Sequence, residues 1–445
     1  MKGFKLFFKW LGIILAVTLI TSGFILYPLL RGATGYTAKM LCSGVFVEGL
    51  SQQQVELREL TAFPFNKVVS RVDIETKSVK SAIFGLVSQK AVFEDEIGAT
   101  LYPDGYKSIE GRIALPRPNN DTLLWPQGSM LTDTLPQGVD VEGLSRFVDE
   151  QFIATSRAVV IVKDGQLILE KYAEGISEFT PLLGWSMTKT ITAALTGILV
   201  KDGKLDIEKS ALLEKWKDDE RRDITLNNLL QMSSGLEWNE DYSKTSLTDV
   251  SKMLYVESDM FDFASSPKLA SSPDAVWQYS SGTTNIISGI LHSCFDDYQS
   301  YYQFPQKALF NKLGMMHSYI ETDATGTFVG SSYGYCSARD WARLGMLYLY
   351  DGNWFGEQIL PEWWVEYSTT PAISSNGKYG VQIWLNASQI HMPHMPADVY
   401  FLNGYRGQRV AIIPSKNMVV ACLNSSPHGV DYNFYLSEMM KFISE

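Results

Sequence analysis

The chain has 445 residues, of which 45% are hydrophobic and 20% are charged. This composition excludes an intrinsically disordered chain and is enough for one large folded domain or two smaller ones. The formal net charge of −11 argues against nucleic acid as a partner, because a polyanion requires a basic face and the sequence shows no run of Lys and Arg that would form one.

The N-terminal segment predicts export with retention at a membrane. Lys2, Lys5 and Lys9 precede residues 10–30, which carry no charge. A helix over residues 10–30 would be about 30 Å long, which is enough to cross the hydrocarbon core of a membrane. We therefore expect residues 1–9 to be cytoplasmic and residues 10–30 to form a transmembrane signal anchor. The rest of the chain would then lie outside the cytoplasm, at the periplasmic face of a bacterial inner membrane. A cleaved signal peptide is the alternative, although no clear Ala-x-Ala site follows.

The metal-binding residue types are sparse and poorly spaced. His391 and His394 flank a proline and have no third histidine nearby, so they predict a loop, and we expect neither a metal nor a cofactor. The spacing of the four cysteines fits no metal or redox motif, and we expect four separate buried thiols, although export would permit disulfides. The cysteines are Cys42, Cys294, Cys336 and Cys422.

Residues 31–140 are predicted to be an N-terminal extension and linker. Within them, residues 67–75 and 79–92 mix apolar and polar side chains at strand-like intervals. Residues 116–128 are rich in Pro, Gly and Asn, which is typical of a linker.

Residues 141–445 predict an α+β domain. Strands at both ends of this region surround a helical middle, which predicts an antiparallel sheet flanked by helices plus a helical subdomain. The expected elements, in chain order, are a helix over 143–152, a hairpin of 158–163 and 166–172 with an Asp-Gly turn, strands over 379–385, 399–402, 408–413 and 417–423, and a closing helix over 431–444.

The sequence Ser-Met-Thr-Lys at 186–189 is one of three Ser-x-x-Lys matches, and a helical apolar pattern follows it alone. On a helix, Ser186 and Lys189 would share one face of the first turn. A buried lysine loses its charge more easily than in water and could take the serine proton, while helix N–H groups could stabilise an oxyanion. A capped helix start with a solvated lysine is the alternative.

Two later motifs could complete a site. Tyr279 opens the sequence Tyr-Ser-Ser-Gly before an apolar helical pattern, and a lysine ammonium beside it would lower the pKa of the phenol so that it could shuttle protons. Gly404 lies in Asn-Gly-Tyr-Arg-Gly-Gln at 403–408, where glycines would let a strand pass close to a substrate. A packed turn and a β-bulge are the alternatives.

Taken in order, these three motifs over about residues 141–445 resemble those of the class C β-lactamase-like serine hydrolases, especially the branch of 6-aminohexanoate-dimer hydrolases. The resemblance implies a β-lactamase/penicillin-binding-protein-like fold. It implies that Ser186 is the nucleophile and that Lys189 and Tyr279 transfer protons.

The same resemblance implies the substrate-binding residues. The backbone N–H groups of Ser186 and Tyr405 would form the oxyanion hole, with Gly404 and Gln408 on the same strand segment. Tyr242 resembles a tyrosine that contacts the substrate in that branch.

Two departures from the family pattern narrow the substrate. Ser281 replaces the asparagine of the Tyr-x-Asn motif, and no Lys-Thr-Gly triad precedes the last strands. Both argue against β-lactams and peptidoglycan. We therefore expect a serine hydrolase that cleaves a small-molecule ester or linear amide through an acyl-enzyme.

Two other functions fit parts of the sequence. The sequence Gly-Ser-Ser-Tyr-Gly at 330–334 matches the Gly-x-Ser-x-Gly elbow of α/β-hydrolases, which would make Ser332 the nucleophile. The helix that an elbow needs starts only near residue 337, and no alternating strand–helix series is present. A non-catalytic, membrane-anchored, penicillin-binding-like binder is the other alternative.

Overall fold

The computed structural model describes residues 2–105, 107, 109, 112–120, 122–132, 135–210, 212–241 and 247–444. Its largest sheet has six antiparallel strands in the order β12-β13-β14-β15-β5-β6. The first and last parts of the hydrolase-like region therefore pair at the centre of one sheet. The bounds are β5 (Ser156–Lys163), β6 (Gln166–Tyr172), β12 (Trp384–Leu385), β13 (Tyr400–Gly404), β14 (Gln408–Ile413) and β15 (Met418–Asn424).

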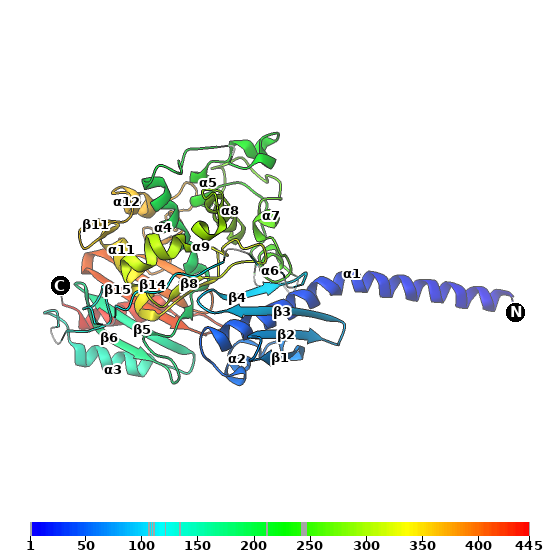
Figure 1. The fold of residues 1–445 in the computed structure, drawn as a ribbon, viewed down its shortest axis with the longest axis horizontal. Helices are drawn as coiled ribbons and strands as arrows, with labels where there is room; N and C mark the ends of the chain where they lie inside the picture. The colour runs from blue at the N-terminus through cyan, green and yellow to red at the C-terminus, as the bar shows by residue number, and fades with distance from the viewer. Residues whose placement is uncertain are drawn as a thin grey trace.

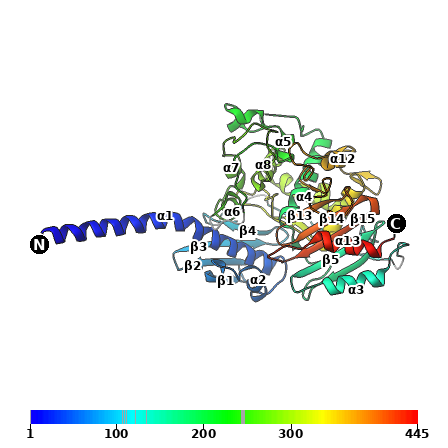
Figure 2. The same ribbon diagram turned by 180° about the vertical axis from the view of Figure 1, so that it is seen from behind.

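Helices cover both faces of this sheet (Figures 1 and 2). Along β5, Val159 and Ile161 face a core shared with α3 (Val141–Gln151) and α13 (Tyr432–Met439), while Val160 and Val162 face the opposite core. This alternation follows from the two-residue period of a strand. Helix α11 (Ala338–Leu349) packs on the second face, against β5, β14 and β15.

A helical region lies between β6 and α11, together with a small three-stranded sheet in the order β7-β9-β8. Figure 1 shows these helices grouped on one side of the six-stranded sheet. The helices are α4 (Thr188–Lys201), α5 (Leu226–Leu230), α6 (Asp249–Tyr255), α7 (Met260–Ala264), α8 (Ser281–His292), α9 (Tyr298–Pro305) and α10 (Asn311–Leu313). The short strands are β7 (Leu182–Leu183), β8 (Ser318–Ile320) and β9 (Gly334–Cys336), and later come β10 (Asn353–Trp354), β11 (Glu357–Gln358) and α12 (Trp364–Thr369).

The N-terminal extension is a four-stranded antiparallel sheet against a long helix, α1 (Lys2–Phe46). The C-terminal half of α1 packs on β2, β3 and β4, whereas its N-terminal half projects from the rest of the chain (Figure 1). The other elements here are α2 (Gln52–Glu59), β1 (Val69–Asp73), β2 (Ser78–Ile83), β3 (Val87–Glu94) and β4 (Gly98–Tyr102).

The membrane anchor expected over residues 10–30 lies within α1. Among the residues that the structure describes, no helix is both long enough and apolar enough to cross a membrane.

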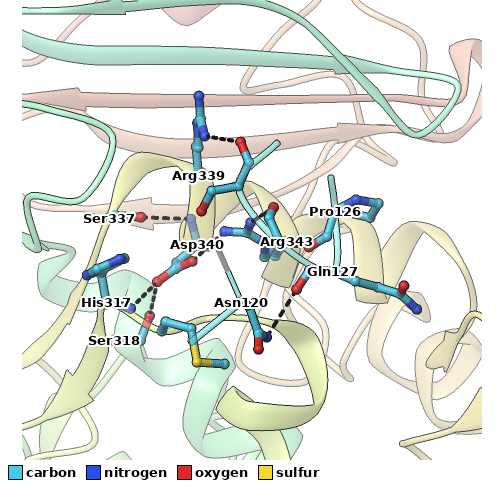
Figure 3. A network of polar contacts seen from close by, with 12 residues as sticks. Asn120, Pro126, Gln127, His317, Ser318, Ser337, Arg339, Asp340 and Arg343 are labelled. Carbon is cyan, nitrogen blue, oxygen red and sulfur yellow. Dashed lines mark hydrogen bonds and ion pairs between the residues drawn. The ribbon is translucent and has the colours of Figure 1, made fainter. Parts of the chain in front are cut away.

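The linker before α3 is held by α11 (Figure 3). Arg343 donates to the carbonyl oxygens of Pro126 (2.7 Å) and Gly128 (2.8 Å), and it forms an ion pair with Asp340 at 2.6 Å. Arg339 donates to the carbonyl oxygen of Ser129 at 3.1 Å. Two buried arginines thus supply the hydrogen bonds that this turn-rich segment lacks internally.

The predicted α+β plan is confirmed, and several predicted elements differ in extent. Residues 79–92 divide into β2 and β3, because Phe84 (φ 53°) and Gly85 (φ 68°) form a turn. Only the last two residues of the strand predicted over 379–385 pair in the six-stranded sheet, because Gln382 has a φ of 54°. All four cysteines are free thiols, and Cys294 alone among them is half-buried.

Candidate active site

Ser186 lies in a turn between β7 and α4. Trp185, the preceding residue, has a φ of 49°, which is strained for a bulky side chain and is usually maintained by surrounding packing. Thr188 donates from its hydroxyl to the carbonyl oxygen of Trp185 at 2.6 Å. A β-carbon on Gly184 would lie 2.1 Å from the ring of Trp341, so only glycine fits there. The turn is therefore fixed on both sides of Ser186.

Lys189 is buried at the start of α4, with 1% of its surface exposed. Its Nζ lies 3.1 Å from Ser186 Oγ, 3.0 Å from Ser281 Oγ and 3.0 Å from the carbonyl oxygen of Ser331. The three neighbours come from the turn before α4, the start of α8 and the loop before β9. The solvated lysine considered as an alternative is wrong.

Burial lowers the pKa of Lys189 to about 8, and the nearby charge of Glu240 opposes that decrease. A lysine in water has a pKa of about 10.4 and is almost fully protonated at neutral pH. A substantial fraction of Lys189 is therefore a neutral amine near pH 8, in contact with the hydroxyl of Ser186. This is the condition for a general base.

The side chain of Tyr279 is hydrogen-bonded to that of Ser186, and the Nζ of Lys189 lies 4.8 Å from the centre of its ring. The expected decrease in the phenol pKa is wrong. Burial, aided by Glu240, raises the pKa of Tyr279 well above its usual value, although the hydrogen bond to Ser186 lowers it. Tyr279 is thus a neutral phenol that can donate a proton, and Lys189 is the stronger candidate for the base.

Ser281 and Glu240 extend the cluster beyond the residues that the sequence motifs indicated. Glu240 accepts hydrogen bonds from the hydroxyl and the backbone N–H of Ser281, both at 2.6 Å, and from the indole of Trp238 at 2.7 Å. Glu240 lies in the sequence Trp-Asn-Glu-Asp at 238–241, just before Tyr242. A carboxylate two residues before the predicted substrate contact was the available signal. Tyr242 itself lies outside the described residues.

The segment of Gly404, Tyr405 and Gln408 lies beside the Ser186 turn. The rings of Tyr405 and Trp185 meet edge to face with centroids 5.6 Å apart. A β-carbon on Gly404 would lie 2.1 Å from the carbonyl oxygen of Gly184, so the close approach that glycine permits here is to the turn itself. Gln408 is buried and donates to the carbonyl oxygen of Tyr405 at 3.2 Å, which supports the β13–β14 turn. The oxyanion role remains a prediction.

The Gly-x-Ser-x-Gly elbow is not formed. The chain after Ser332 continues into strand β9 instead of a helix, and Ser332 is only 3% exposed. The loop still contributes to the cluster, because the carbonyl oxygen of Ser331 accepts a hydrogen bond from Lys189. The backbone N–H of Ser331 donates to Asn285 Oδ1 at 3.2 Å.

The histidine pair has structural contacts. His391 packs edge to face on Trp384 and Phe401, and His394 is hydrogen-bonded to Asn433 at 3.0 Å. In the part of the chain that the structure describes, no group of three or more His, Cys, Asp or Glu side chains could hold a metal ion.

Known structures share this fold. A Bacillus anthracis protein assigned as a 6-aminohexanoate-dimer hydrolase is 24% identical with a TM-score of 0.60, over 73% of this chain and 88% of its own. A Bacteroides dorei protein assigned as a beta-lactamase is 17% identical with a TM-score of 0.51, over 68% and 97% of the two chains. A class C beta-lactamase in complex with cefoxitin is 14% identical with a TM-score of 0.50, over 68% and 99%.

No curated protein matches the chain. The family model described as Beta-lactamase matches residues 144–438, which is more than half of the sequence. The predicted family and the β-lactamase/penicillin-binding-protein-like fold are confirmed, and the α/β-hydrolase alternative is wrong, because the chain belongs to the Beta-lactamase family.

Proposed function

We propose that this protein is a serine hydrolase that cleaves an ester or a linear amide through an acyl-enzyme on Ser186. The observation that carries the proposal is the 3.1 Å contact between Ser186 Oγ and Lys189 Nζ, whose pKa burial lowers to about 8. Membership of a family of hydrolases supports the general activity.

The proposed reaction follows from the protonation states of Lys189 and Tyr279. Ser186 Oγ attacks the carbonyl carbon while its proton passes to the neutral Lys189. The tetrahedral intermediate collapses when the bond to the leaving group breaks, and the neutral phenol of Tyr279 can relay the proton from Lys189 to that group. Water then gives a proton to Lys189 and adds to the acyl carbon. The bond between that carbon and Ser186 Oγ breaks, the acid is released, and Oγ takes the proton from Lys189.

The test is the intact mass of the chain after mixing with a fluorophosphonate or a p-nitrophenyl ester at pH near 8. We expect one covalent adduct on the unmodified chain and none on Ser186→Ala. Ser332→Ala is the matched control and should react like the unmodified chain, because Ser332 is buried outside the cluster. An unmodified chain that forms no adduct would instead be the non-catalytic binder.

A panel of substrates addresses the chemical class. Ser281 stands where β-lactamases have the asparagine of Tyr-x-Asn, and the sequence lacks a Lys-Thr-Gly triad. We expect hydrolysis of short esters and linear amides to exceed that of a nitrocefin-type β-lactam. A β-lactam that reacts faster than every ester and amide of the panel would overturn this choice.

A further inference from the structure

Glu240 occupies a defined position one hydrogen bond away from Lys189. Its Oε1 accepts from the hydroxyl of Ser281, and its Oε2 accepts from the backbone N–H of Ser281 and the indole of Trp238. We propose that Glu240 is a positioning residue that acts through Ser281 to aim the lone pair of Lys189 at Ser186. This inference rests on the proposed function and deepens it.

The directions of the hydrogen bonds carry the argument. The hydroxyl of Ser281 has a single proton, and it donates that proton to Oε1 of Glu240. Ser281 Oγ must then accept from Lys189, as the carbonyl oxygen of Ser331 also must. A neutral amine has two N–H bonds and one lone pair. With both N–H bonds directed to Ser281 and Ser331, the lone pair of Lys189 faces Ser186, 3.1 Å away.

Without the carboxylate, this orientation would no longer be fixed. The hydroxyl of Ser281 could rotate and donate to the lone pair of Lys189, which would remove the base from Ser186. Trp238 helps to orient the carboxylate, since its indole and the backbone N–H of Ser281 both donate to Oε2 while the hydroxyl of Ser281 donates to Oε1. A β-carbon on Gly282 would lie 2.6 Å from the ring of Trp238, so this indole packs tightly on the first turn of α8.

The charge of Glu240 has a second consequence. Among the described residues, the contacts place two titratable groups around the Lys189 amine, namely Tyr279 and Glu240, and the phenol of Tyr279 stays neutral. Glu240 therefore provides the negative charge that stabilises the ammonium formed when Lys189 takes the proton. Glu240→Gln removes this charge at constant size. The substitution also places an amide NH₂ against either the hydroxyl of Ser281 or the two N–H groups that bind Oε2, namely the backbone N–H of Ser281 and the indole of Trp238.

The test is the rate at which a fluorophosphonate labels Ser186, measured over a series of pH values. For the unmodified chain we expect the rate to rise with pH through about 8, as Lys189 loses its proton. For Glu240→Gln we expect the maximal rate to fall roughly tenfold and the midpoint to move down by about one pH unit. A purely structural disturbance would admit water and move the midpoint up, toward an ordinary lysine.

Glu237→Gln is the matched control. Glu237 is an exposed carboxylate of the same segment and should leave both the maximal rate and the midpoint unchanged. Equal behaviour of the two variants, or an upward shift in Glu240→Gln, would overturn the positioning role.

A double-mutant cycle tests whether Glu240 acts through Ser281. We expect Ser281→Ala to slow labelling roughly tenfold. Adding Glu240→Gln to Ser281→Ala should then reduce the labelling rate by little more. Independent losses that multiply would overturn the route through Ser281, and Ser281→Ala remains informative if Glu240→Gln does not fold. Labelling that persists in Ser186→Ala, or that is absent from the unmodified chain, would refute the proposed function together with this inference.

Discussion

Gly404 approaches Gly184 so closely that a β-carbon on Gly404 would lie 2.1 Å from the carbonyl oxygen of Gly184. The first of these residues ends β13, and the second precedes the turn that carries Ser186. The end of strand β13 therefore lies directly against the backbone of the turn that carries the candidate nucleophile. This contact explains why the second position of the motif at 403–408 is a glycine.

Gly404→Ala should separate β13 from the Ser186 turn. The added methyl group meets backbone, which cannot rotate away, so we expect a loss of about 1–3 kcal/mol in stability. Activity should fall by roughly a hundredfold, because small displacements of reacting groups are costly. Thermal unfolding and the rate of ester hydrolysis measure the two effects. Asn403→Ala on the same strand is the control, and equal activities of the two variants would contradict the role of the contact.

The N-terminal extension also reaches this region. Arg406, next to Tyr405, forms an ion pair with Glu59 of α2 at 2.8 Å and donates to the carbonyl oxygen of Arg58 at 2.8 Å. A small cavity beside this ion pair is lined by Glu59, Arg406 and Trp185, so α2 lies against the Ser186 turn.

Glu59→Ala should therefore impair both stability and activity. The guanidinium of Arg406 loses a charged partner in a half-buried site, and we expect a cost of about 2 kcal/mol. The value of kcat should fall more than that of KM, because the change affects the β13–β14 turn rather than a binding surface. Unfolding and steady-state kinetics measure this, with the exposed Glu56→Ala of the same helix as the control. Unchanged kcat in Glu59→Ala would show that α2 does not support the turn.

Local patterns were sufficient to predict the elements that lie on the sheet. The apolar runs of β5 and β14 and the Asp-Gly turn between β5 and β6 are local features of the sequence. Strand β4 was not predicted, because all five of its residues are buried and the segment shows no alternation. The long α1 was missed beyond residue 30, since contacts with the β1–β4 sheet stabilise that part of the helix.

The residues of the candidate site likewise differ in whether local sequence patterns could predict them. The serine, the lysine and the tyrosine could be found from spacing, because each precedes or begins a helix. Glu240 could not, because its role depends on a hydrogen bond to Ser281, far away in the sequence, and on the indole of Trp238. The pKa of Tyr279 was predicted in the wrong direction, since burial, the largest cause of its increase, is a property of the folded chain.

Lys39→Ala should detach the N-terminal extension from the hydrolase domain. Lys39 of α1 forms an ion pair with Glu321, and neither side chain is exposed to solvent. Burial already raises the pKa of Glu321, and removal of the cation leaves a buried carboxylate that must take up a proton or stay charged without a cation beside it. We expect a loss of about 3–5 kcal/mol.

The loss should depend on pH in a defined direction. Glu321 in Lys39→Ala binds its proton more tightly in the folded chain than in the unfolded chain. The deficit should therefore grow as pH rises above the ordinary range of a carboxyl group. Thermal unfolding at several pH values tests this, with the exposed pair of Lys77 and Asp95 broken by Lys77→Ala as the control. A deficit that does not change with pH would contradict the assignment of the effect to Glu321.

Tyr279→Phe should distinguish the role of Tyr279 as proton donor from that of Lys189 as base. The phenol is hydrogen-bonded to Ser186 and is neutral, so its loss should lower kcat roughly a hundredfold by removing the relay to the leaving group. The rise of kcat/KM with pH should keep its midpoint near 8, because that midpoint belongs to Lys189. Ester hydrolysis over a pH series measures both quantities. Tyr379→Phe, whose ring lies 5.9 Å from that of Tyr279, is the matched control and should retain full activity. If the midpoint near 8 disappeared in Tyr279→Phe, the base would be the tyrosine and the division of roles would be reversed.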